Sequence, residues 1–263
     1  MNTFNDFFNS VIIEAYERTR YTFDRIPYSA QSIYGSSEGR LIREATTIAE
    51  GSHGSVSDDQ EEFTEIPQLA RRKAAKFKLF NAIKNKEERA LYIWAKQKKL
   101  LISNEEFIRQ WERDGKKGEA EHEVYYDEPT HRWFKRNTLN FHSTFLEYFH
   151  RLALHNYMFP EAPVQLEGFL VRYDHLYPII SQPHIQATRG ATQAEVKVHM
   201  EAMGFEHIPG SDDYYNEKSG IRVEDLHDEN VLISPEGYMY IVDPLVYLDE
   251  DGKKHRLAAY SKI

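Results

Sequence analysis

Residues 224–233 read Glu-Asp-Leu-His-Asp-Glu-Asn-Val-Leu-Ile, and a second apolar run at 240–242 ends in Asp243. The pattern predicts a polar loop followed by a β-hairpin, with the turn Ser-Pro-Glu-Gly at 234–237 between its two strands. Because the two ends of a hairpin meet, we expect Asn230 and Asp243 to lie side by side. The sequence therefore predicts two polar side chains that converge at one end of a hairpin.

Asn230 and Asp243 have the chemistry of a magnesium site. Amide and carboxylate oxygens are hard ligands, and Mg²⁺ takes few of them from a protein before phosphates and water complete its shell. Asp225, five residues before Asn230, would reach the same pocket from the other side and orient or deprotonate a hydroxyl group. Two alternatives are a polar hairpin loop with turn-forming Asp and Asn, and a hydrolase-type metal site made by Asp225, His227 and Asp228.

The composition excludes several classes of protein. The 263-residue chain carries 33 basic and 42 acidic side chains, for a net charge of −9. An acidic chain is a poor candidate for nucleic-acid binding, because neutralising phosphates supplies much of that affinity. It contains no cysteine, which excludes disulfides and thiolate metal sites. No apolar run reaches the ~18 residues of a membrane helix, and no signal-peptide pattern is present, so we expect a cytoplasmic protein without a membrane partner.

The apolar pattern divides the chain into two unlike halves. In residues 1–114 apolar side chains recur at i, i+3 and i+4, which predicts helices. In residues 115–263 short apolar strands alternate with turns, and a capping box at Thr192 and Glu195 opens a further helix. We therefore expect an α+β protein with a helical N-terminal region at 1–114 and a compact domain at 115–263. The helical region is the candidate surface for a protein partner.

The motif Asp-x-His-x-x-Asn, formed by Asp225, His227 and Asn230, resembles the catalytic loop of the protein-kinase-like fold in its aminoglycoside-phosphotransferase type. The strand that ends in Val-Asp at Asp243 is similar to the segment that carries the metal-binding aspartate of that fold. Protein kinases also place the catalytic Asp five positions before the Asn. The resemblance implies a bilobal kinase-like domain with Asp225 as the catalytic base, and Asn230 and Asp243 as Mg²⁺ ligands.

The resemblance also assigns a lysine and its carboxylate partner. Lys135 ends the strand Trp-Phe-Lys and would pair with the phosphates of a nucleotide. Glu147, on the helix that follows, would hold Lys135 in place, and Glu161 is the alternative partner. The resemblance therefore implies that Lys135 and Glu147 belong to the catalytic machinery.

The nucleotide would lie between a glycine segment and a hinge. Gly118 precedes the first strand of the domain, and Gln182 and His184 lie where the resemblance places the hinge that meets the adenine. The resemblance thus implies ATP and Mg²⁺ as cofactors.

More narrowly, segments at 121–125, 166–169, 181–183 and 189–192 resemble the polyvalent protein kinases found in large proteins of phages and conjugative elements. The sequence also departs from an ordinary kinase. It has no full Gly-x-Gly-x-x-Gly, and Pro-Leu follows the metal-binding aspartate in place of Phe-Gly. The short remainder after that aspartate predicts a truncated C-lobe.

We therefore expect an ATP- and Mg²⁺-dependent phosphotransferase that acts on a protein hydroxyl group or a small molecule. Two alternatives use the same scaffold. One is a nucleotidyl transferase in which the nucleotide binds in reverse. The other is a pseudokinase or interaction module in a conflict system of phages or mobile elements, which the missing glycine loop favours and the intact Asp225, Asn230 and Asp243 disfavour.

Overall fold

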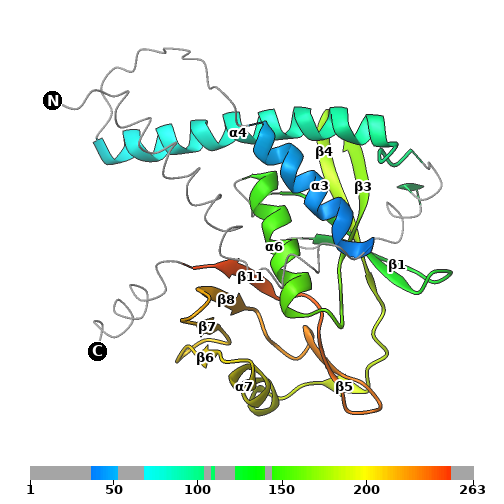
Figure 1. Cartoon of the computed structure of the whole chain (residues 1–263), viewed down its shortest axis with the longest axis vertical. Coiled ribbons are helices and arrows are strands. Elements are labelled where there is room, and N and C mark those ends of the chain that lie inside the picture. The colour runs from blue at the N-terminus through cyan, green and yellow to red at the C-terminus, as the bar shows by residue number, and fades with distance from the viewer. Residues whose placement is uncertain (1–36, 53–67, 104–107, 110–121, 140–143, 250–263) are drawn as a thin grey trace.

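The computed structural model describes residues 37–52, 68–103, 108–109, 122–139 and 144–249 of the chain (Figure 1). The helices in these ranges are α3 (Ser37–Gly51), α4 (Gln68–Lys98), α6 (Phe145–Met158) and α7 (Gln193–Ala202). The strands are β1 (His122–Asp127), β2 (Arg132–Asn137), β3 (Gln165–Arg172), β4 (His175–Pro183), β5 (Arg189–Gly190), β6 (Glu206–His207), β7 (Tyr214–Asn216), β8 (Ile221–Glu224), β9 (Val231–Ile233), β10 (Met239–Ile241) and β11 (Leu245–Leu248). This mixture of helices and antiparallel sheets confirms the predicted α+β class. None of the helices in the described ranges is both long enough and apolar enough to cross a membrane.

The first sheet has the strand order β1-β2-β4-β3, and its neighbouring strands are antiparallel. The β3–β4 hairpin turns at Tyr173 and Asp174, whose φ angles of 50° and 62° are those of a type I′ turn. A hairpin across these two residues is also what the sequence pattern predicts. Because side chains alternate along a strand, Lys135 and Phe134 of β2 point to opposite faces of the sheet.

Helix α6 is fixed at its N-terminus from two directions. Thr144 is the N-cap and accepts a hydrogen bond from the backbone N–H of Glu147 at 3.1 Å. Glu87 of α4 is fully buried and accepts hydrogen bonds from the backbone N–H groups of Phe145 at 2.7 Å and Leu146 at 3.4 Å. A carboxylate is stabilising there, because the first N–H groups of a helix lack partners within it and carry partial positive charge. Helix α4 therefore sets where α6 begins.

Helices α3, α4 and α6 share one hydrophobic core with the first sheet (Figure 1). The buried side chains of this core include Ile42, Ala45, Leu91, Trp94, Phe149, Leu166, Phe169 and Ile180. The segment after α4 also pairs with the edge of β3, since Ile102 N–H donates to Phe169 O at 2.8 Å and Phe169 N–H to Leu100 O at 2.9 Å. The division at 114/115 stays a prediction, and residues on both sides of it share this core.

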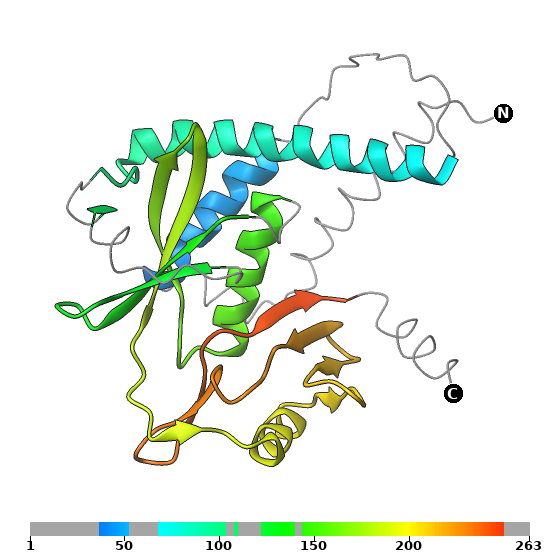
Figure 2. The ribbon, with the colours of Figure 1, turned by 180° about the vertical axis from the view of Figure 1, so that it is seen from behind.

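Two smaller sheets and α7 lie below the first sheet (Figure 2). One sheet has the order β10-β9-β5 and the other the order β11-β8-β7-β6. Their common core includes Val196, Met200, Tyr214, Val223, Val231 and Ile241. Helix α7 begins with the predicted capping box, in which the side chains of Thr192 and Glu195 each accept a hydrogen bond from the backbone N–H of the other residue. Because α6 packs against β11 as well as the first sheet, it joins the two parts.

Candidate active site

The predicted hairpin is formed by β9 and β10. Val231 lies opposite Ile241 in antiparallel register, and Val242 N–H donates a hydrogen bond to Asn230 O at 2.9 Å. The hairpin therefore brings Asn230 to the residue that immediately precedes Asp243, as its spacing predicts.

A second pair of strands, β8 and β11, flanks Asp225 and Asp243. β8 ends at Glu224, directly before Asp225, and β11 begins at Leu245, two residues after Asp243. Glu224 and Leu245 are cross-strand partners. Asp225 and Asp243 therefore leave the sheet from adjacent strand ends, so paired strands define the position of each carboxylate.

Lys135 and Asp243 form an ion pair between the two parts of the molecule. Lys135 Nζ lies 2.9 Å from Asp243 Oδ1, and the lysine side chain is only 7% exposed, whereas 44% of the aspartate side chain remains accessible. The partial burial of Asp243 would raise its pKa, but the charge of Lys135, assisted by His122, outweighs this effect and holds that pKa below its ordinary value. Asp243 is therefore a carboxylate at neutral pH, with one oxygen on the lysine.

Asp225 adopts a backbone conformation that is uncommon for a residue with a side chain. Its φ angle is 66°, in the left-handed region, where Asp and Asn are tolerated better than most residues. The amide nitrogen of Asn230 donates to Asp225 O at 2.9 Å and to Asp225 Oδ2 at 3.1 Å. These bonds hold both the backbone and the carboxylate of Asp225. Such strained residues cluster at functional sites.

His227 packs within the loop. Its Nδ1 accepts a hydrogen bond from the backbone N–H of Glu229 at 3.2 Å, and its Nε2 lies 3.5 Å from Asp225 Oδ1 and 3.2 Å from the amide nitrogen of Asn230. Both ring nitrogens therefore face partners in the loop. Within the part of the chain that the structure describes, no three His, Asp or Glu side chains form a group that could hold a metal ion, which gives no support to a hydrolase-type cluster at Asp225, His227 and Asp228.

Glu147 lies on α6, as predicted, and its carboxylate pairs with Arg151 one turn further on, at 3.0 Å. Lys135 pairs with Asp243. The pairing of Glu147 with Lys135 stays a prediction. The alternative, Glu161, lines an apolar pocket at the C-terminal end of α6.

The hinge residues have well-defined partners. Gln182 is 2% exposed, and its amide nitrogen donates to Ala162 O at 2.7 Å. His184 Nδ1 accepts a hydrogen bond from Trp133 Nε1 at 3.1 Å, and its backbone N–H donates to His131 O at 3.0 Å. The nucleotide contacts of Gln182 and His184 stay predictions. Gly118 lies outside the described residues.

Two further residues near the site were not predicted. Trp133 is two residues from Lys135 on β2 and so points to the same face, about 7 Å along the strand. The alternation in Trp-Phe-Lys is the signal that indicates this. Gly190 of β5 pairs with β9, and a Cβ atom there would lie 2.3 Å from Asp228 O. Gly190 therefore allows β5 to pass close to the loop at 225–230, a contact between distant segments that no local pattern reveals.

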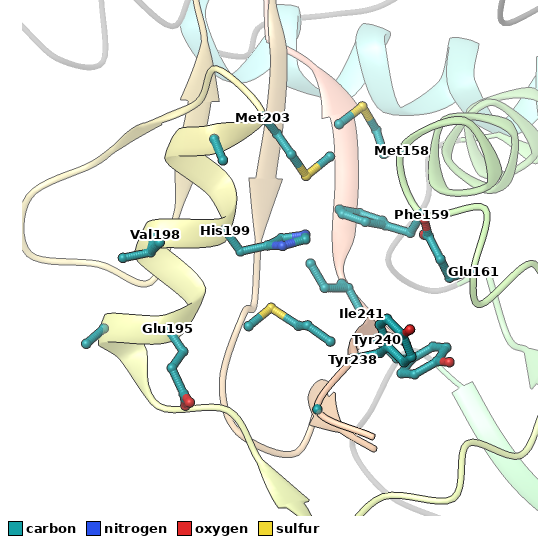
Figure 3. A pocket seen from close by; sticks show the side chains of 14 residues that line it. Met158, Phe159, Glu161, Glu195, Val198, His199, Met203, Tyr238, Tyr240 and Ile241 are labelled. Carbon is teal, nitrogen blue, oxygen red and sulfur yellow. The ribbon is translucent and has the colours of Figure 1, made fainter. Parts of the chain in front are cut away.

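A separate pocket of about 1110 Å³ lies between α7, β10 and the end of α6 (Figure 3). Figure 3 shows His199 of α7 pointing toward Phe159 across this space. Most of its lining is apolar, and it contains none of Asp225, Asn230 and Asp243. The three candidate site residues therefore lie at the end of the β9–β10 hairpin and not in this pocket.

A buried lysine paired with an aspartate at a hairpin end, beside an Asp–Asn loop, brings together residue types that a kinase-like domain uses at its phosphate and metal site. A family model described as "Serine/Threonine/Tyrosine Kinase found in polyvalent proteins" matches residues 84–250, more than half of the chain. The chain belongs to this kinase family. No curated protein and no solved structure matches it. The match begins inside α4 and so includes Glu87, which caps α6.

Proposed function

We propose that this protein is an ATP- and Mg²⁺-dependent phosphotransferase whose acceptor is a protein hydroxyl group or a small molecule. The first sheet and α6 would act as the N-lobe of a bilobal domain, and the smaller sheets with α7 as its C-lobe. The observation that carries the proposal is the 2.9 Å ion pair between Lys135 and Asp243, because it joins these two parts at the predicted catalytic loop.

The donor set fits magnesium. The amide nitrogen of Asn230 is committed to Asp225, which leaves its amide oxygen as the ligand atom. Asp243 is held as a carboxylate and supplies a second hard oxygen. Two protein ligands are few, but Mg²⁺ usually keeps several waters and phosphate oxygens in its shell. When bound, the ion would neutralise charge on the phosphates.

Lys135 would position the phosphates of the nucleotide. A lysine that is 7% exposed needs a negative partner, and Asp243 serves as that partner in the structure. Phosphate oxygens would offer the ammonium group a second set of acceptors. In the predicted arrangement, Glu147 would hold the lysine from α6. The adenine base of the nucleotide would then lie further along β2 toward His184, on the face of the sheet that Trp133 shares with Lys135.

Asp225 would act as the general base that accepts the proton of the acceptor hydroxyl group. Its side chain is 51% exposed, so an acceptor molecule can approach it from solvent. One carboxylate oxygen would take the proton of the acceptor hydroxyl as the new oxygen–phosphorus bond forms and the bond between the γ-phosphorus and its bridging oxygen breaks. The hydrogen bond from Asn230 would keep the carboxylate oriented during this transfer.

Labelled ATP tests the proposal. Wild-type protein is incubated with Mg²⁺, cell lysate and either γ- or α-labelled ATP, beside Asp225→Asn and Asp243→Asn. We expect γ-label transfer by the wild type and a loss of at least about 100-fold in both variants. Asp174→Asn, at an exposed position with a similar positive φ, is the matched control and should transfer label normally.

Each other result identifies a different function. Transfer of α-label would assign nucleotidyl transfer. Mg²⁺-dependent binding of ATP without label transfer would assign a pseudokinase. Equal transfer by the wild type and both variants would exclude catalysis by this site.

A further inference from the structure

The strand that leads to Asp225 is held by a guanidinium group. Arg222 of β8 pairs through Nη2 with Asp213 at 2.7 Å and through Nη1 with Asp249 at 3.3 Å. Its Nε lies 2.6 Å from Oε1 of Glu224. The arginine side chain is 15% exposed. One planar group therefore connects the segment before β7, the strand β8 and the segment after β11.

The charges make this contact strong. Three carboxylates face one guanidinium, so each would repel the others if the arginine were absent. Burial would lower the pKa of Arg222, but its hydrogen bond with Asp213 and the nearby carboxylates raise that pKa overall. The arginine therefore stays charged at neutral pH.

Tyr247 of β11 contacts the same carboxylate oxygen of Glu224 as Arg222. Its hydroxyl donates to Glu224 Oε1 at 2.5 Å. Burial, followed by this hydrogen bond, raises the pKa of Tyr247, so its hydroxyl keeps its proton and stays a donor. Tyr247 is also the cross-strand partner of Arg222. Glu224 is thus fixed by two neighbouring side chains.

The contacts continue to α6. The guanidinium carbon of Arg151 lies 5.6 Å from the centre of the Tyr247 ring, within the range of a cation–π interaction. Arg151 also pairs with Glu147 at 3.0 Å. A continuous set of contacts therefore runs from α6 through Tyr247 to Glu224, the residue immediately before Asp225.

We propose that Arg222 and Tyr247 are positioning residues for the phosphotransfer reaction. By fixing Glu224 they hold Asp225 in its positive-φ conformation, and through Arg151 they connect that conformation to α6. This role rests on the proposed function. Neither residue lies among the predicted ligands of ATP or Mg²⁺, so their loss should lower turnover and leave nucleotide binding unchanged.

Turnover and binding are measured separately to test this. Tyr247→Phe removes one hydroxyl and Arg222→Met removes the charge. We expect kcat for γ-phosphate transfer from Mg²⁺·ATP to the protein itself or to water to fall about 10-fold, with the KM for ATP unchanged. Tyr173→Phe, whose tyrosine is 90% exposed, is the matched control. Because Arg222→Met leaves three carboxylates without their counter-charge and can unfold the protein, Tyr247→Phe is the deciding variant.

Hydrogen–deuterium exchange gives a readout that needs no turnover. The backbone N–H groups of Asn230 and Val231 each donate to His227 O at 3.0 Å. Both should exchange faster in Tyr247→Phe than in the wild type, while amides of β3 and β4 keep their rates. Unchanged kcat and exchange, or an equal loss of kcat and ATP affinity, would overturn the proposal. A wild type without transferase activity would instead count against the proposed function, and exchange alone would then decide whether Tyr247 holds the loop.

Discussion

Lys135 carries a positive charge in a place where water scarcely reaches it. A charge that is 7% exposed persists only with a partner, and Asp243 supplies one at 2.9 Å. The aspartate is in turn kept ionised by the lysine. Each residue therefore offsets the charge of the other, and the proposed function would have a nucleotide phosphate and Mg²⁺ share these two charges.

Trp133 offers a test of where the nucleotide base lies. Its indole is on the Lys135 face of β2 and is oriented by the hydrogen bond from Nε1 to His184 Nδ1 at 3.1 Å. Stacking of a base on an aromatic ring contributes about 1–3 kcal/mol. We therefore expect Trp133→Ala to weaken Mg²⁺·ATP binding by that amount, measured by isothermal titration calorimetry.

The matched variants for this prediction are Trp133→Phe and Phe134→Leu. Trp133→Phe keeps a ring on the same face and should retain most of the affinity. Phe134 points to the opposite face of the sheet, so its replacement should leave affinity unchanged. Tighter ATP binding by Trp133→Ala would show that the indole blocks the site.

Sequence spacing was sufficient to predict that Asn230 lies near Asp243 in the fold. Asn230 and Asp243 are brought together by one hairpin, whose pairing follows from local pattern. The partner of Glu147 was not predictable in the same way, because Arg151 competes from the same helix, one turn away. Gln182 was expected at the hinge, but which atoms its amide reaches depends on how the segment around Ala162 packs.

At the level of elements, helix α6 carries two buried histidines. Burial lowers the pKa of His150 to about 3 and that of His155 to about 4, from an ordinary value of 6.5. Below pH 6.5 the unfolded chain therefore binds protons that the folded chain does not. Stability should fall as the pH drops from about 6.5 to 4, by ~1.4 kcal/mol per pH unit for each histidine.

Urea unfolding at pH 7.5 and pH 5.5 measures this loss. His150→Leu should lose less stability between the two pH values than the wild type, because one of the two buried groups is gone. His175→Leu replaces a histidine whose side chain is 66% exposed and should behave like the wild type. An identical pH dependence in His150→Leu and the wild type would contradict the prediction.

Local elements were predictable where their signals lie within a few residues. The β3–β4 turn at Tyr173 and Asp174 and the capping box of α7 are examples. The cap that Glu87 provides for α6 joins residues 58 positions apart and has no local signal. The close approach at Gly168 also has no local signal. A Cβ atom there would lie 2.2 Å from Leu100 O, in the segment that covers the edge of β3.

At the level of the whole molecule, the shared core predicts that the domain cannot be cut at 114/115. Leu91 and Trp94 of α4 and Ile42 of α3 are buried against α6 and the first sheet. A protein of residues 115–263 would expose the surface that they cover and should not fold. Its near-ultraviolet circular dichroism should show little fixed tertiary structure.

A protein of residues 37–263 is the comparison for this truncation, since it keeps α3 and α4. It should show a near-ultraviolet spectrum of fixed tertiary structure and a cooperative thermal transition. A folded 115–263 protein with normal ATP binding would show that the helices are dispensable and that the boundary at 114/115 is a real domain boundary.

The paired strands beside Asp243 restrict how its backbone can move. Only Val242 and Pro244 separate this aspartate from β10 and β11, and β11 is hydrogen-bonded along its length to β8. An aspartate tethered so closely on both sides cannot swing outward without breaking a sheet. A rearrangement that separates Lys135 from Asp243 at the level of the backbone would therefore move the first sheet, with Lys135, relative to the strands beside Asp243.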